Sequence, residues 1–104
     1  MEEGYQLIIS PEAAADLEAI RAYIARDSEE YARGMVERIL TSIEGLKATP
    51  HRYVLERQNK KLRFPVRSLP VRPYIVFFRV VEQDRVVRIL TIRHGARRRP
   101  RRFS

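Results

Sequence analysis

The sequence predicts an α+β fold: an N-terminal strand, an antiparallel helix hairpin and a three-stranded antiparallel meander, forming a small antiparallel sheet with both helices on one face. Apolar residues recur every three or four positions between residues 11 and 48, as in helices buried on one side. Beyond residue 65, short apolar runs separated by polar or proline-containing turns indicate strands. A chain of 104 residues supports one core, so we expect a single domain over residues 1–104 with a basic tail at about 95–104.

A short strand over Tyr5–Ile9 is expected to lead into the first helix. The strand stops at Ser10 and Pro11, where a serine side chain can cap a helix and proline suits the first helical position. The helix then places a residue on one buried face every three or four positions, at Ala13, Leu17, Ile20 and Ile24. We expect it to end near Arg26.

The second helix is expected to begin at a capping box formed by Asp27 and Glu30. It closes near residues 47–48, before Thr49 and Pro50. Because almost no loop separates the two helices, they should pack as an antiparallel hairpin. The buried side of the second helix carries six apolar residues: Met35, Val36, Ile39, Leu40, Ile43 and Leu46.

Residues 51–65 are polar and basic and show no clear period, so we interpret them as a long loop. Three strands follow at Val66–Val71, Tyr74–Val81 and Val86–Arg93, and a polar turn joins the last two into a hairpin. Both faces of the middle strand are largely apolar, although the helices can cover only one of them. The other face is therefore either covered by the tail or left for a partner.

Charge is distributed unevenly along the chain. Residues 1–51 contain five Lys/Arg and ten Asp/Glu, a net charge of −5, whereas residues 52–104 contain sixteen against three, a net charge of +13, which together give +8. This asymmetry predicts a basic surface for a polyanion or an acidic protein, unless arginine is simply a common surface residue here. The chain has no cysteine, which excludes disulfides and thiolate metal sites and suits a cytoplasmic location. No apolar run approaches the roughly 18 residues that span a membrane.

Several blocks of sequence, taken in order, resemble the RelE/ParE family of toxins. The resemblance covers roughly residues 5–97, and its most specific block is an apolar strand that runs into the sequence His-Gly-Ala-Arg. The blocks are Ser10–Ala13 with Asp16, Leu17 and Ile20; Ile43 with Leu46 and Pro50; Val71–Val80; and Arg88–Leu90 followed by Arg93–Arg97.

The resemblance implies a small cytoplasmic toxin held in a hetero-oligomer by a cognate, ParD-like antitoxin. The ParE branch of the family is known for poisoning DNA gyrase, and the RelE branch cuts messenger RNA on the ribosome with basic residues and no metal. The ribonuclease branch carries an arginine after the aromatic residue that begins the central strand, where this chain has Ile75 after Tyr74, and often a tyrosine near the C-terminus, where this chain has Phe103. Because neither replacement can stabilise phosphate charge or move a proton, the chain stands nearer the ParE branch.

The candidate partner-binding residues are Arg72, Tyr74, Phe77, Arg79, Arg93 and Arg97. Arginine binds a phosphate or an antitoxin carboxylate equally well through its bidentate fork, and Tyr74 is also a candidate core residue. If the chain is a ribonuclease, its catalytic residues are Arg72, Arg93, His94 and Arg97. The alternative for His94 is a structural role at the end of the last strand, and His51 is expected to be only solvated. We predict no metal site, because the two histidines lack ligand spacing, and no cofactor.

The leading hypothesis is a non-enzymatic toxin that inhibits growth through DNA gyrase. The second is a metal-independent mRNA endoribonuclease whose partner is the ribosome or RNA, and the third is a non-toxic basic nucleic-acid-binding module. For a toxin, we expect the antitoxin to bury either the exposed apolar face of Tyr74–Val81 or the groove beside the helix hairpin. None of these hypotheses involves a membrane.

Overall fold

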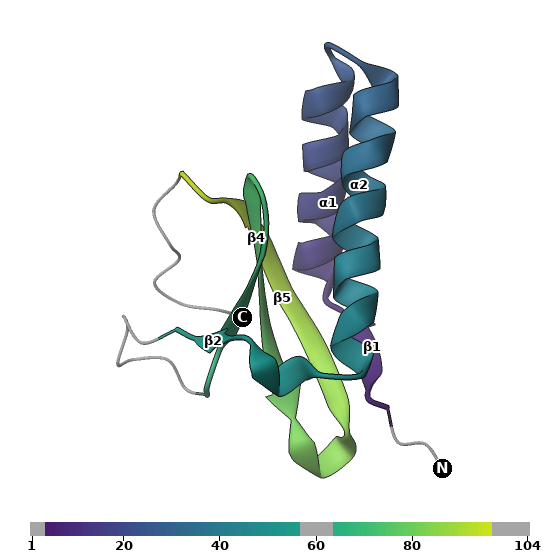
Figure 1. The fold of residues 1–104 in the computed structure, drawn as a ribbon. Coiled ribbons are helices and arrows are strands. Elements are labelled where there is room, and N and C mark those ends of the chain that lie inside the picture. Colours follow the sequence, from purple (N-terminus) through teal and green to yellow (C-terminus); the bar gives the residue numbers. More distant parts are fainter. Residues whose placement is uncertain (1–3, 57–63, 97–104) are drawn as a thin grey trace.

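The computed structural model describes residues 4–56 and 64–96, in which a helix hairpin packs on one face of a five-stranded sheet (Figure 1). The predicted α+β fold is confirmed, and the predicted strands and helices occur in the predicted order, with one further strand, β2, after the helices. The sheet has the order β1-β5-β4-β3-β2. The elements are β1 (Gln6–Ile9), α1 (Pro11–Ala25), α2 (Glu29–Glu44), the 3₁₀ turns η1 (Gly45–Lys47) and η2 (Pro50–Arg52), β2 (Val54–Leu55), β3 (Arg67–Val71), β4 (Tyr74–Val81), the 3₁₀ turn η3 (Glu82–Asp84) and β5 (Val86–His94).

The sheet is mixed, so the prediction of a purely antiparallel sheet was wrong for its first strand. β1 pairs in parallel with β5, from Gln6 beside Val86 to Ile9 beside Ile89, whereas all other neighbours are antiparallel. Parallel neighbours require a long crossover connection, and the helix hairpin with the strands that follow it supplies one. The N-terminal strand and the last strand therefore lie side by side although they are far apart in sequence.

Residues 51–65 were predicted as a loop, and this prediction was wrong for their first part. η2 is followed by β2, whose Val54 and Leu55 pair with Ser68 and Arg67 of β3. A strand of two residues is too short to show an alternating pattern, so the sequence gives no signal for it. Residues 57–63 lie outside the part that the structure describes.

Serine side chains cap both helices. Ser10 Oγ accepts a hydrogen bond from Ala13 N at 3.0 Å, with Pro11 in the first helical position, as predicted. In α2 the cap is Ser28, whose Oγ accepts from Tyr31 N at 3.0 Å, so the predicted capping box at Asp27 was wrong by one residue. Asp27 instead belongs to the short turn between the two helices.

The main core lies between the helix hairpin and the sheet. Its residues from α2 and η1 include the predicted Met35, Ile39, Ile43 and Leu46, whereas the predicted Val36 and Leu40 lie outside it and Leu40 is exposed. The sheet contributes Val76 and Phe78 of β4. A second, smaller cluster on the opposite face contains Val66, Phe77 and Leu90, with Phe64 and Ile75 packed at its edge. The chain thus covers much of the second apolar face of β4 itself, which corrects the expectation of an exposed apolar face.

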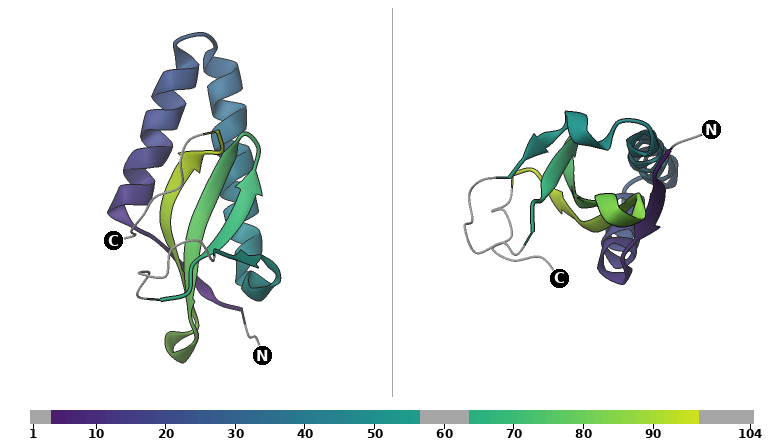
Figure 2. Two further views of the ribbon diagram at one scale, coloured as in Figure 1. Left: turned by 90° about the vertical axis from the view of Figure 1, so that its left-hand side faces the viewer. Right: turned by 90° about the horizontal axis from the view of Figure 1, so that it is seen from below.

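The helix hairpin is longer than the sheet and projects beyond one end of it (Figures 1 and 2). The turn between β3 and β4 and the C-terminal end of β5 meet at this same end. The overhang creates a concave angle between the helices and the end of the sheet. None of the described helices is long and apolar enough to cross a membrane.

Candidate partner-binding groove

A groove of about 800 Å³ occupies the angle between the overhanging helix hairpin and the end of the sheet. Both helices, the turn between β3 and β4 and the end of β5 line it. Tyr23 of α1 and Tyr31 of α2 lie on this wall and remain 67% and 62% exposed, beside the partly buried Ile24 and the buried Met35. Large, exposed apolar side chains around one hollow are typical of a surface that binds a partner.

The end of β5 is fastened to the turn that precedes β4. Gly95 N donates to Pro73 O at 2.7 Å, and a Cβ at Gly95 would come within 3.1 Å of that oxygen, so this close approach favours glycine. His94 lies edge-on to Tyr74, with ring centroids 5.4 Å apart, and its Nδ1 accepts from Ala96 N at 3.1 Å. The imidazole therefore bonds to backbone, as the structural interpretation of His94 predicts.

Asp16 of α1 lines the groove and bonds to the end of β5. Asp16 Oδ2 accepts from Thr91 Oγ1 at 2.6 Å and from Ile92 N at 2.9 Å. β1 pairs with β5 only as far as Ile89, so Asp16 satisfies a backbone donor on the edge of β5 that β1 no longer covers, while β4 still pairs with the other edge. Asp16 was not among the predicted site residues, because its partners Thr91 and Ile92 are distant in sequence.

Arg93 is held by the same network. Its Nε donates to Thr91 Oγ1 at 3.0 Å, and its Nη2 lies 3.6 Å from Glu12 Oε2. Arg93 lines the groove with a half-exposed side chain, but Glu12 offsets part of its charge. Arg93 can therefore bind a single carboxylate or phosphate oxygen at the rim, but it does not make the groove strongly cationic.

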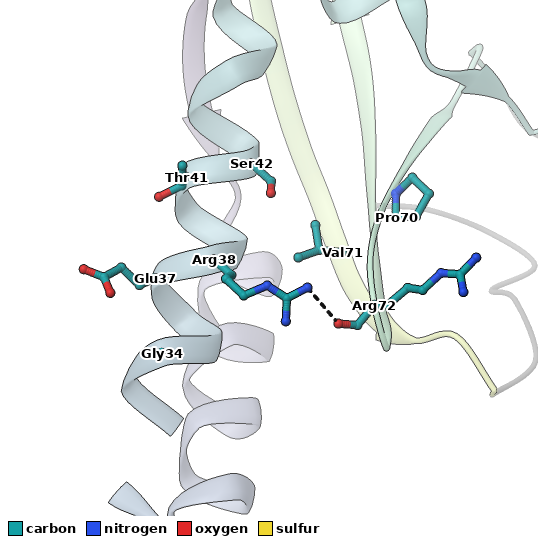
Figure 3. Close-up of a pocket in the computed structure, with 8 residues that line it drawn as sticks. All are labelled: Gly34, Glu37, Arg38, Thr41, Ser42, Pro70, Val71 and Arg72. Atoms are coloured by element: carbon teal, nitrogen blue, oxygen red, sulfur yellow. Dashed lines mark hydrogen bonds between the residues drawn. The ribbon is translucent and has the colours of Figure 1, made fainter. Parts of the chain in front are cut away.

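A second hollow of about 610 Å³ lies between α2 and β3, next to the groove (Figure 3). Arg38 of α2 crosses it and donates from Nη2 to the main-chain oxygen of Arg72 at 3.2 Å. In Figure 3 the side chain of Arg72 extends away from α2, so only its backbone takes part in this contact. The hollow is lined mainly by polar residues, and it has less apolar surface than the groove.

The structure brings only some of the predicted site residues together. Tyr74, Arg93 and His94 line the groove, and Arg72 lies in the adjacent turn. Tyr74 is 8% exposed and Phe77 is 1% exposed, so both are core side chains, and Phe77 is not presented to a partner in the structure. Arg79 lies with Phe77 on the sheet face opposite the helices. Arg97 lies outside the described residues.

A cluster of polar side chains joins three segments at the other end of the sheet. Glu82 Oε2 accepts from Tyr5 Oη at 2.5 Å and lies 2.7 Å from His51 Nε2, and the guanidinium of Arg85 is centred 4.1 Å from the Tyr5 ring. The hydrogen bond to Glu82 raises the pKa of Tyr5, and the hydrogen bonds from Tyr5 and His51 lower the pKa of Glu82. His51 is therefore not merely solvated, which corrects the sequence-based expectation.

No group of three histidine, cysteine, aspartate or glutamate residues within the described ranges could hold a metal ion. The groove is instead lined by exposed tyrosines, aliphatic side chains and an arginine, Arg93, whose charge Glu12 partly offsets. Such a surface suits an amphipathic protein segment better than a small polar substrate.

Comparison with known proteins points to one family. A family model described as the ParE toxin of a type II toxin–antitoxin system, parDE, matches residues 7–99. No match was found among curated proteins. The fold is similar to a structure of a chromosomal ParDE toxin–antitoxin system from P. aeruginosa, at 26% sequence identity and a TM-score of 0.69 over 86% of this chain and 95% of that one.

Two structures of more distant sequence share the fold. An archaeal RelE–RelB complex from Pyrococcus horikoshii gives a TM-score of 0.63 at 15% identity, over 92% of this chain and 100% of that one. The toxin–antitoxin complex RelBE2 from Mycobacterium tuberculosis gives a TM-score of 0.57 at 22% identity, over 88% and 99%. Since the family model matches most of the sequence, the chain belongs to the ParE toxin family of type II toxin–antitoxin systems.

Proposed function

We propose that this toxin inhibits growth by acting on DNA gyrase without covalent catalysis, and that a cognate antitoxin neutralises it by filling the groove beside the helix hairpin. Membership of the ParE family supports a gyrase target over a ribosomal one. The single observation that supports the antitoxin site is the groove of about 800 Å³, with two tyrosines left more than 60% exposed on its helical wall.

The groove favours an amphipathic segment of the antitoxin. Tyr23, Ile24 and Tyr31 offer an apolar wall, against which one face of a helix could pack. Arg93 and His94 lie on the opposite wall, where a carboxylate of the segment would meet them. Burying exposed tyrosines is among the strongest contributions to protein–protein affinity, so these residues should dominate binding.

The alternative, a ribonuclease, fits this end of the sheet less well. Cleavage without a metal needs a base, an acid and cations at the developing phosphorane charge. His94 Nδ1 is occupied by Ala96 N, and Arg93 is shared between Thr91 and Glu12. Ile75, at the position where the ribonuclease branch has an arginine, packs with the second apolar cluster.

The proposal is tested by adding the purified toxin to two reactions in parallel: supercoiling of relaxed plasmid by gyrase, and translation of a defined transcript. We expect supercoiling to stop while the transcript stays intact, and an equimolar amount of antitoxin should restore supercoiling. The opposite pattern would favour the ribonuclease. In that case transcripts would be cut at defined codon positions and supercoiling would be unaffected, and the His94→Ala variant would no longer cut.

A further inference from the structure

Thr91 of β5 connects a carboxylate of α1 to the arginine at the rim of the groove. The residue is buried, with only 2% of its surface exposed. Its hydroxyl donates to Asp16 Oδ2 at 2.6 Å, and the same oxygen accepts from Arg93 Nε at 3.0 Å. One hydroxyl therefore serves as donor and acceptor at once and links the carboxylate to the guanidinium.

The bond to Asp16 fixes the direction of this hydroxyl. A carboxylate only accepts, so Thr91 directs its proton toward Asp16 and keeps a lone pair for Arg93 Nε. Asp16 is itself held, because its Oδ2 also accepts from Ile92 N at 2.9 Å. Thr91 is β-branched and therefore stiff at χ1. The acceptor for Arg93 Nε is thus fixed by the protein before any partner binds.

This contact holds one edge of the Arg93 guanidinium and leaves its two amino groups for a partner. Within the described residues, one carboxylate lies near them, with Glu12 Oε2 at 3.6 Å from Nη2. The Arg93 side chain is 40% exposed. A long side chain at such a position samples several rotamers, and fixing it when a partner binds reduces the affinity. Because Thr91 orders Arg93 in the free protein, it lowers this entropic cost.

We propose that Thr91 is a positioning residue: held by Asp16, it orients Arg93 to bind a carboxylate of the antitoxin at the rim of the groove. This inference rests on the proposed function, since it requires the antitoxin to fill the groove. A fixed guanidinium distinguishes aspartate or glutamate from the corresponding amide, because only a carboxylate accepts at both oxygens. The chain of bonds from Asp16 through Thr91 to Arg93 makes the rim selective for an acidic side chain.

The test combines the affinity for the cognate antitoxin with a measurement on the free toxin. Calorimetry compares the wild-type toxin with Thr91→Val, Thr91→Ser, Arg93→Ala and the double variant with Thr91→Val and Arg93→Ala. Valine has nearly the shape of threonine without the hydroxyl, whereas serine keeps the hydroxyl. Thr41→Val is the matched control, because it removes a hydroxyl from an exposed position of α2 outside the groove. In the free toxin, nuclear magnetic resonance relaxation of Arg93 Nε measures the order of the guanidinium.

We expect Arg93→Ala to bind the antitoxin about tenfold more weakly, as for a lost charged hydrogen bond, and Thr91→Val about fivefold more weakly, as for one side chain left unordered. Thr91→Ser and Thr41→Val should bind like wild type. The two losses should not add, so Thr91→Val should change the affinity no further once Arg93 is alanine. Arg93 Nε should be ordered in wild type and in Thr91→Ser and mobile in Thr91→Val.

Equal order of Arg93 Nε in wild type and Thr91→Val would overturn the inference. So would losses that add in the double variant, because Thr91 would then act on binding independently of Arg93. Failure of the proposed groove looks different: antitoxin affinity would be unchanged in Tyr23→Ala and Tyr31→Ala, and this inference would fall with it. Affinity that is lowered by the tyrosine variants but not by Thr91→Val would contradict this inference alone.

Discussion

Single side chains in this toxin connect segments that are distant in sequence. Asp16 of α1 closes the open edge of β5, and Glu82 joins Tyr5 to His51 at the other end of the sheet. The sequence shows which of these residues are polar, but it does not show their partners, because each bond spans at least 31 positions. Residue-scale contacts of this kind are therefore the part of the structure that sequence patterns predict least well.

Replacing Asp16 with alanine should destabilise the fold. The change leaves the amide of Ile92 and the hydroxyl of Thr91, both in buried residues, without their acceptor, at a cost of about 1–3 kcal/mol. Asp16→Asn keeps an oxygen and should cost less. Urea unfolding of the three proteins checks the order, and equal stability of Asp16→Ala and wild type would show that the bonds contribute nothing net.

The Glu82 cluster should make stability depend on pH in the acid range. Because its folded-state pKa is lowered, Glu82 contributes stability above its unfolded pKa of about 4.3, and this contribution is lost as pH falls through the folded value. Glu82→Gln should therefore melt at a lower temperature than wild type at pH 7, and the difference should shrink at pH 3. A difference that is constant between these two pH values would contradict the assignment.

At the scale of elements, the helices and the long strands were predictable and the sheet edges were not. The apolar period of α1 and α2, with the Ser10-Pro11 signal before α1, predicts a hairpin because burial of one face determines where apolar residues stand. β2 has only two residues and β1 pairs in parallel, and neither feature leaves a pattern in sequence. The groove forms because the helices extend beyond the sheet. No local sequence pattern shows how far they will do so.

Gly34 is a position in α2 at which a substitution should stabilise the protein. It lies inside the helix, and nothing lies within 4 Å of the position that a Cβ would take. Gly34→Ala should therefore raise the free energy of unfolding by about 1 kcal/mol, the difference in helix propensity. Chemical denaturation measures this directly, and a loss of stability would mean that the surroundings of Gly34 are tighter than the structure indicates.

At the scale of the whole molecule, the proposed antitoxin groove and the Glu82 cluster lie apart. The groove occupies the end of the sheet beneath the overhanging hairpin, and the Glu82 cluster secures the opposite end (Figure 1). The family could be recognised from sequence because its blocks follow the order of the core elements. The sequence could name the groove only as one of two candidate antitoxin surfaces, and Phe77 on the other surface is buried.

The affinity of the toxin for its antitoxin, measured with the groove tyrosines removed, tests the central claim most directly. Tyr23→Ala and Tyr31→Ala, alone and together, are compared with Val54→Ala, which removes a 71% exposed apolar side chain from β2. Each tyrosine variant should bind at least about tenfold more weakly, with unchanged melting temperature, while Val54→Ala binds like wild type. Wild-type affinity in the double tyrosine variant would show that the antitoxin neutralises this toxin elsewhere.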